Sequence, residues 1–202
     1  MKVFIHYALV LLIITGLACG ILAMVNKQTK PVIEKNQAES ENNARSQVIE
    51  GAVDFEKQSL KINETKSLDY YIAKDAQANV LGYTFIAIGK GYSGELKTMV
   101  GVDPDFKIKK ILVIQQTETP GLGANCTKPE FNEKFANLTF NDLKVDKDGG
   151  NIKSISGATI TTRAITNSIK ETLDMLQKNL NQSVKPVQNV QDTLSVQQGV
   201  EI

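Results

Sequence analysis

The feature that most constrains this chain is an apolar run at its N-terminus. No Asp, Glu, Lys or Arg occurs between Val3 and Val25, a stretch of 23 residues. As a helix rising about 1.5 Å per residue, such a run is long enough to cross a hydrocarbon core of about 30 Å. We therefore expect a single transmembrane anchor within residues 1–25, with the rest of the chain folded outside the bilayer.

Two other interpretations of this run are weaker. A cleaved signal peptide has a shorter apolar core and usually ends in an Ala-x-Ala site, which is missing here. A lipoprotein signal centred on Cys19 fits poorly, since Gly16-Leu17-Ala18 precedes it and Cys19 falls in the middle of the run. Basic residues are more numerous after the run than before it. Counted alone, they would place the domain in the cytoplasm, although this rule is weak for a long domain, so the run by itself leaves the orientation open.

Charge and composition exclude several classes of function. The chain holds 23 basic and 22 acidic residues, and Lys2 is the one charged residue before position 26, so the remainder is formally neutral. A neutral domain offers no basic stripe for nucleic acid. Cys19 and Cys126 belong to different parts of the chain and are not expected to pair. One histidine and two cysteines do not build a zinc or iron–sulfur site.

Hydrophobic patterning divides the rest of the chain. Residues 26–59 are predicted to be a polar helical linker, 60–180 a folded domain, and 181–202 a flexible tail without a core pattern. Strands are predicted at 67–74, 80–88, 96–102 and 107–116, and a short helix at 127–137. A second helix at 161–180 carries an apolar stripe of Ile165, Ile169, Leu173, Leu176 and Leu180. The fold class is therefore α+β, an antiparallel sheet with flanking helices.

The start of that last helix is a candidate anion site. Residues 156–162 read Ser-Gly-Ala-Thr-Ile-Thr-Thr. The first N–H groups of a helix lack partners within it and lie at the positive end of the helix dipole, so such a place binds phosphate. The hydroxyl of Thr159 is a candidate for esterification by that phosphate. Taken alone, the same residues are more often an ordinary helix cap.

Two glycine-rich segments are the other candidates. Glu118-Thr119-Pro120-Gly121-Leu122-Gly123 follows a strand-like run, and its Pro-Gly pair predicts a tight turn at which Leu122 is able to cover a flat ring. Gly89-Lys90-Gly91-Tyr92-Ser93-Gly94 leaves N–H groups free for a ligand and adds the Tyr92 ring. It lacks the Gly-Lys-Ser/Thr ending of a nucleotide-hydrolase loop, and no βαβ unit surrounds it, so NADH binding is not expected. Each segment alone is more often a hairpin turn.

Four motifs in order carry a family resemblance. They are Gly91-Tyr92-Ser93-Gly94, Val100-Gly101-Val102-Asp103, Glu118–Gly123 and Ser156-Gly157-Ala158-Thr159. In this the chain resembles the G subunit of the Rnf electron-transport complex, a member of the FMN-binding domain family. It is similar also to the C subunit of the sodium-translocating NADH:quinone reductase. The N-terminal run matches the single membrane anchor of that family.

The resemblance implies a covalent flavin. In the family, FMN is joined through its phosphate to the threonine that closes the Ser/Thr-Gly-Ala-Thr motif, which is Thr159 here, and a flavin transferase installs it from FAD with magnesium. The family pattern has an aspartate six residues before that threonine, where this chain has Lys153. The implied cofactor-binding residues are Ser156, Gly157, Ala158, Thr159, Thr161, Thr162, Tyr92, Ser93, Glu118, Thr119, Gly121, Leu122 and Gly123.

The function implied is that of an electron relay. The chain would be a redox subunit without its own active site, in an ion-translocating ferredoxin:NAD oxidoreductase of the inner (cytoplasmic) membrane. Its flavin domain would face the periplasm or its equivalent, and its partners would be integral membrane subunits and subunits with iron–sulfur or flavin groups. The alternatives are the C subunit of the quinone reductase, a stand-alone tethered FMN carrier for an extracytoplasmic reductase, and a flavin-free scaffold.

Overall fold

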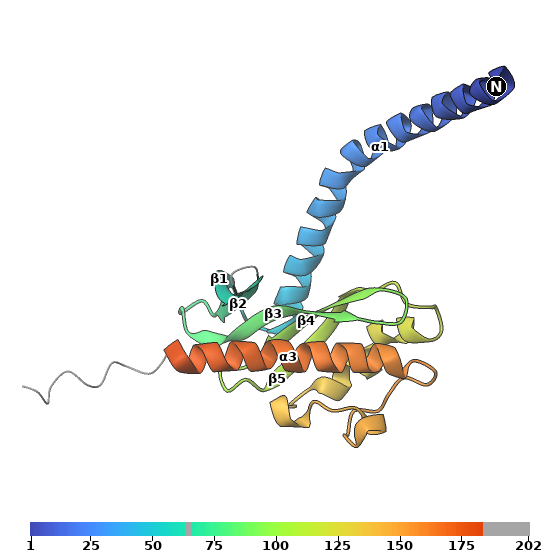
Figure 1. Cartoon of the computed structure of the whole chain (residues 1–202). Helices are drawn as coiled ribbons and strands as arrows, with labels where there is room; N and C mark the ends of the chain where they lie inside the picture. Colours follow the sequence, from blue (N-terminus) through green and yellow to red (C-terminus); the bar gives the residue numbers. More distant parts are fainter. Residues whose placement is uncertain (64–65, 184–202) are drawn as a thin grey trace, which may run out of the picture. The chain divides into compact units, whose positions relative to one another are not determined.

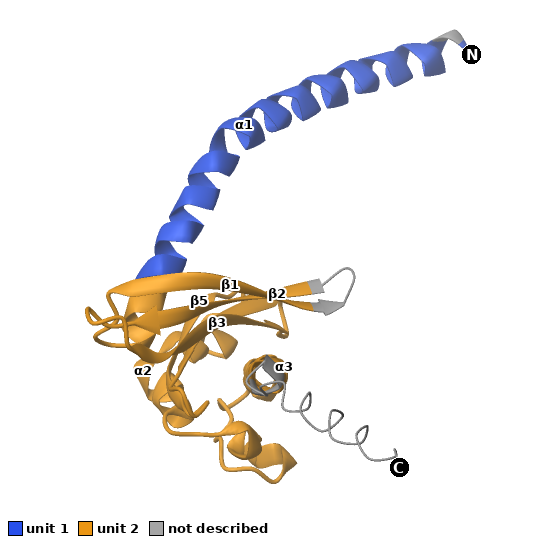
Figure 2. Ribbon diagram, turned by 90° about the vertical axis from the view of Figure 1, so that its left-hand side faces the viewer, with its two compact units in different colours: residues 1–44 blue, residues 45–202 orange. Residues whose placement is uncertain are grey.

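The computed structural model describes residues 1–63 and 66–183, which form two compact units (Figure 2). The first unit, Met1–Ala44, is the greater part of helix α1, which spans Lys2–Val48. Among the described residues, α1 is the one helix that is long and apolar enough to cross a membrane, and none of its most apolar window is buried. The predicted anchor is therefore helical, and the helix continues through the polar residues that follow.

The second unit begins at Arg45 and contains a five-stranded antiparallel sheet. Its strands are hydrogen-bonded in sequence order, so the sheet is a simple meander (Figure 1). They are β1 Asp54–Asn63, β2 Lys66–Lys74, β3 Val80–Lys90, β4 Glu95–Val102 and β5 Ile108–Gln115. The last four agree with the sequence prediction to within two residues, because Val, Ile and aromatic residues are concentrated in them.

Strand β1 was not predicted. It is one of the two edge strands, and it carries Glu56 and Lys57, whose charged groups lie 2.6 Å from Lys74 and 2.7 Å from Asp69 on β2. Edge strands commonly carry charged side chains, so they do not show the alternation of apolar and polar residues by which strands are recognised in a sequence. The sheet thus begins at Asp54, inside the range expected to be a helical linker.

Helix α3, Thr159–Ser183, lies across one face of the sheet (Figures 1 and 2). Four residues of the predicted stripe are fully buried there, and Leu180 packs at the edge of the same core. The buried four are Ile165, Ile169, Leu173 and Leu176. The apolar side chains facing them from the sheet include Phe85, Leu96 and Ile111. Packing therefore fixes the helix along its length and so fixes the position of its first turn.

A run of short helices connects β5 to α3. They are η1 Gly123–Thr127, α2 Pro129–Asn132, η2 Glu133–Phe135, η3 Phe140–Asp142 and η4 Asp146–Asp148. Phe131 and Phe135 lie within the range predicted as a short helix, and they are buried with ring centroids 5.4 Å apart. Most of the tail expected at 181–202 lies outside the described residues, which end at Ser183 in α3.

Candidate functional site

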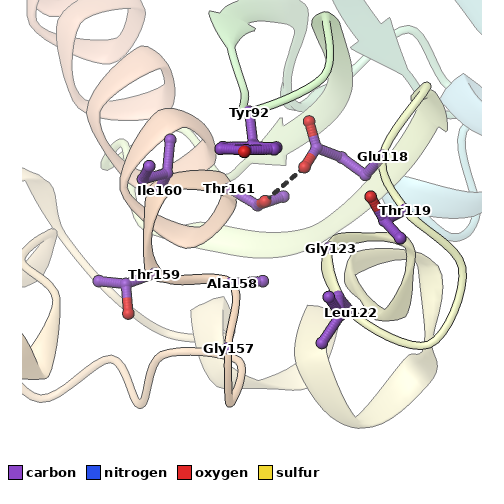
Figure 3. A pocket seen from close by; sticks show the side chains of 10 residues that line it. All are labelled: Tyr92, Glu118, Thr119, Leu122, Gly123, Gly157, Ala158, Thr159, Ile160 and Thr161. Atoms are coloured by element: carbon purple, nitrogen blue, oxygen red, sulfur yellow. Dashed lines mark hydrogen bonds between the residues drawn. The ribbon is translucent and has the colours of Figure 1, made fainter.

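Three segments far apart in the sequence meet around a pocket of about 510 Å³ (Figure 3). One is the loop between β3 and β4, the second is the turn after β5, and the third is the start of α3. The lining residues are Tyr92, Glu118, Thr119, Leu122, Gly123, Gly157, Ala158, Thr159, Ile160 and Thr161. The three segments that the sequence offered as candidate ligand sites are thus brought together at one place, whereas the fourth motif, residues 100–103, does not line the pocket.

The first turn of α3 presents backbone donors at this pocket. Gly157 has a φ of 72°, and the N–H of Ala158 donates to the Ile155 carbonyl at 2.9 Å, so a tight turn leads into the helix. The N–H groups of Thr159, Ile160 and Thr161 have no acceptor among the described residues. Unpaired donors at the positive end of a helix dipole suit a negatively charged group.

The three threonines of this turn have different environments. Thr162 is buried; its hydroxyl accepts the Ile155 N–H at 3.0 Å and donates to the Ala158 carbonyl at 3.2 Å. Thr161 is also buried, and its hydroxyl donates to Glu118 Oε2 at 2.7 Å. Thr159 is half-buried, and its hydroxyl makes no hydrogen bond within the part of the chain that the structure describes. In Figure 3 Thr159 lies on the side of the turn away from Glu118.

Glu118 supplies the carboxylate in the wall of the pocket. Its side chain is buried, and Oε1 accepts the Ser93 N–H at 3.0 Å. Its own N–H donates to Gln116 Oε1 at 2.7 Å. The carboxylate therefore connects all three segments that form the pocket. Behind it lies the Cys126 thiol, whose pKa is raised to about 11 by burial and, secondarily, by the charge of Glu118.

The rim of the pocket is apolar and open. Tyr92, Leu122 and Ile160 are 75%, 45% and 51% exposed, although each is a large hydrophobic side chain. Exposed apolar groups gathered around a cavity are typical of a ligand site, and flat aromatic ligands suit such walls. The pocket thus combines an apolar rim with an anion-binding helix start.

The residues predicted from the sequence fall into two groups. Nine line the pocket: Tyr92, Glu118, Thr119, Leu122, Gly123, Gly157, Ala158, Thr159 and Thr161. Four do not: Ser93, which holds Glu118 through its N–H; Gly121, at φ 79° in a turn; Ser156, exposed before α3; and Thr162, engaged with the backbone. Ile160 also lines the pocket, but it was not predicted from the sequence. Its position there depends on the exact residue at which α3 begins.

The segment before α3 is held by two aspartates. Asp146 accepts hydrogen bonds from the N–H and the hydroxyl of Ser154, and that hydroxyl lowers the pKa of Asp146. Asp148 binds Arg163 on the helix itself. Lys153 is exposed, and its carbonyl accepts a hydrogen bond from Lys134 Nζ at 3.0 Å. Among the described residues no cluster of His, Cys, Asp or Glu is suited to hold a metal ion.

Comparison with known proteins defines the class of this molecule. The FMN-binding domain model matches residues 91–174, which include all three segments of the pocket. The model of the RnfG N-terminal region matches residues 2–48, which are helix α1. The chain is therefore an FMN-binding protein with an N-terminal apolar helix.

Relatives narrow the class to a family. The G subunit of the ion-translocating oxidoreductase complex from Methanosarcina acetivorans is 31% identical over 81% of this chain and 89% of its own length. The G subunit of the proton-translocating ferredoxin:NAD(+) oxidoreductase complex from Clostridium ljungdahlii is 34% identical over 77% of this chain and 82% of its own. The chain belongs to the family of G subunits of ion-translocating oxidoreductase complexes.

A solved structure supports the fold. The C subunit of the Na(+)-translocating NADH-quinone reductase from Parabacteroides distasonis is similar with a TM-score of 0.52 and 20% identity, over 72% of this chain and 94% of that one. At this identity the likeness concerns the fold alone. The match of α1 to the RnfG region favours the G-subunit assignment over the quinone-reductase alternative.

Proposed function

We propose that this chain is the flavin-carrying subunit of an ion-translocating ferredoxin:NAD oxidoreductase complex, and that its FMN is attached to Thr159. The C. ljungdahlii relative is named as part of a complex of this kind. FMN, when bound, supplies one- and two-electron redox chemistry. The role of this chain is to hold the flavin in place while electrons pass through it between partner subunits.

The observation that carries the assignment to Thr159 is the state of the three hydroxyls. Those of Thr161 and Thr162 are buried and hydrogen-bonded, whereas that of Thr159 is half-buried, lines the pocket and has no partner in the described chain. A hydroxyl that must react with an external phosphate has to be reachable, and breaking a buried hydrogen bond costs about 1–3 kcal/mol.

The attachment step balances without oxidation or reduction. The Thr159 oxygen forms a bond to the phosphorus on the flavin side of FAD, and the bond between that phosphorus and the bridging oxygen of the pyrophosphate breaks. AMP leaves, and the hydroxyl proton passes to a base. In this proposal a separate flavin transferase catalyses the step, with FAD as the donor.

The remaining residues fit FMN. The free N–H groups of Thr159, Ile160 and Thr161 suit a phosphodiester, which keeps one negative charge. Tyr92, Leu122 and Ile160 supply apolar surface for a flat ring at the open rim. The other proposed binding residues shape the pocket or lie beside it, Glu118 and Thr161 through their side chains. They are Ser156, Gly157, Ala158, Thr161, Thr162, Ser93, Glu118, Thr119, Gly121 and Gly123.

The proposed membrane placement rests on α1. Residues 1–25 would cross the cytoplasmic membrane once, and the folded unit that begins at Arg45 would lie on the extracytoplasmic side. A covalent bond is useful there, because it prevents loss of the flavin from a pocket with an open rim. The partners are the other membrane and redox subunits of the complex.

Fluorescence of the denatured chain tests the attachment. The full chain, purified from a host that has the transferase, should give a flavin-fluorescent band under ultraviolet light. Thr159→Ala should abolish the band, and Thr159→Ser and Thr161→Ala should keep it. Peptide mass spectrometry should place the added mass on Thr159, and a modification on Thr161 or Thr162 would overturn the assignment. Co-purification with other membrane proteins separates a member of a complex from a stand-alone carrier.

A further inference from the structure

We propose that Glu118 is a positioning residue that holds both glycine-rich loops against the start of α3 and places one buried negative charge in the pocket wall. The proposal deepens the proposed function and rests on it, because the charge matters only if the pocket holds a redox group. Its geometric half, the connection of the three segments, is independent of any ligand.

The first argument is the reach of the carboxylate. Oε1 accepts the Ser93 N–H at 3.0 Å across 25 positions of sequence, and Oε2 accepts the Thr161 hydroxyl at 2.7 Å across 43 positions. These are the side-chain hydrogen bonds that connect the pocket's segments to one another in the described chain. Since loops open more easily than packed elements, two such bonds decide how well the pocket is preformed.

The second argument is the space made for it. A Cβ atom at Gly91 would collide with Oε1, and one at Gly123 would collide with both Oε2 and the Thr161 hydroxyl oxygen. Each loop therefore has a residue without a side chain where it approaches the carboxylate. The space around the Glu118 carboxylate is therefore left by glycines of the same two loops that the carboxylate connects.

The third argument is charge. Glu118 is 6% exposed, and no salt bridge among the described residues involves it. An ionised carboxylate is an acceptor only, which matches its two donors from Ser93 and Thr161. Burial, and after it the charge of Glu118, raises the pKa of the Cys126 thiol. Charges interact more strongly inside a folded domain than in water.

A fixed negative charge in the wall makes it harder to add electrons to a ring in the pocket, so it lowers the midpoint potential. The first turn of α3 contributes free N–H groups to the same pocket, and these attract a phosphate. The pocket wall thus holds a negative carboxylate as well as donors for an anion. Glu118 contributes to redox tuning through its charge and to ligand orientation through the loops that it holds.

Two variants separate the charge from the positioning. Glu118→Gln keeps the shape: its amide oxygen accepts the Ser93 N–H, its NH₂ donates to the Thr161 hydroxyl, and the charge is lost. Glu118→Ala loses both. Glu130→Gln, an exposed carboxylate, controls for net charge. All are made in the full chain, solubilised in detergent.

Amide hydrogen exchange at Ser93 tests the positioning in the Thr159→Ala background, which carries no flavin. Exchange should become about tenfold or more faster in Glu118→Ala and stay within about threefold of the parent in Glu118→Gln. Unchanged exchange in Glu118→Ala would overturn the positioning role. This arm stands even if the parent chain is never flavinylated, a result that would reject the proposed function instead.

The midpoint potential of the flavinylated chain tests the charge. It should be more positive in Glu118→Gln than in the parent, and unchanged in Glu130→Gln. Equal potentials in the parent and Glu118→Gln, in samples that are both yellow, would overturn the charge role while leaving the proposed function intact.

Discussion

Asp148 and Arg163 form a two-point ion pair that joins the segment before α3 to the helix itself. Arg163 Nε lies 2.8 Å from Asp148 Oδ2, and Arg163 Nη2 lies 2.6 Å from Oδ1. Arg163 is one turn after Thr159 on α3. The pair therefore connects η4 to the helix turn next to the proposed attachment site, and a fork-to-carboxylate geometry fixes orientation as well as distance.

This pair predicts a specific dependence of stability on pH. The hydrogen bonds from Arg163, followed by its charge, hold the pKa of Asp148 below its ordinary value of 3.8. A depressed pKa stabilises the fold above 3.8, and this contribution is lost as pH falls through the folded-state pKa. Asp148→Asn should lower the melting temperature at pH 7, and its difference from the parent should shrink toward zero below pH 3.8.

Arg163→Gln provides the control for that measurement. In its background, Asp148→Asn should give a much smaller pH-dependent difference, because the partner that lowers the pKa most is gone and the charge of Lys144 remains. A difference of undiminished size without Arg163 would show that the ion pair is not its cause.

The α3 stripe predicts a large loss of stability from a single truncation. Ile169 is fully buried against the sheet, so Ile169→Ala removes apolar burial and leaves a cavity. The cost should be about 2–5 kcal/mol in the free energy of unfolding, measured by chemical denaturation in detergent. Asn167→Ala, on an exposed position of the same helix, should change it by less than about 0.5 kcal/mol. Equal effects at the two positions would mean that α3 does not pack as described.

The sequence predicted the fold correctly in those segments where apolar residues recur at the spacing of one kind of element, either a helix or a strand. The helical stripe from Ile165 to Leu176 and the β-branched strands β3 to β5 follow from spacing alone, because one face of each is buried. Strand β1 does not, since its Glu56 and Lys57 face solvent at a sheet edge and resemble a polar linker.

The site was predictable in its parts but not in its connections. Glycine and threonine motifs identified the three segments, as helix-start and turn chemistry is local. The Glu118 contacts with Ser93 and Thr161 depend on how the sheet and α3 bring distant segments together. The same packing decides that Thr161 is buried while Thr159 is half-buried at the pocket, which no local rule distinguishes.

Cys126 should be unreactive in the folded chain. Burial, and then the charge of Glu118, raise its pKa to about 11, so at pH 8 the thiol is protonated and shielded. In Cys19→Ser, where Cys126 is the remaining cysteine, maleimide should label the native chain slowly and the denatured chain completely. Because the folded pKa is above the ordinary value of 9.0, this thiol's contribution to stability should be lost as pH rises from 9.0 through about 11. Rapid labelling of the native chain would contradict the burial.

The last prediction concerns two glycines with similar positive φ angles. Gly157 and Gly121 have φ values of 72° and 79°, which an L-residue adopts at a cost of about 1–2 kcal/mol. A Cβ at Gly121 would meet nothing within 4 Å, whereas one at Gly157 would lie 3.1 Å from Leu122 Cδ2. Gly121→Ala and Gly157→Ala should therefore lose similar stability, but Gly157→Ala should also displace Leu122 from the pocket rim.

The readout that separates the two variants is flavinylation. If Leu122 helps to receive the ring, Gly157→Ala should give a fluorescent band several-fold weaker than Gly121→Ala at equal amounts of folded protein. The comparison cancels backbone strain, since both variants carry it, and leaves the contact between position 157 and Leu122 as the difference. Equal bands would mean that the chain is flavinylated without the Leu122 side of the pocket, and the proposed apolar wall would then be reduced to Tyr92 and Ile160.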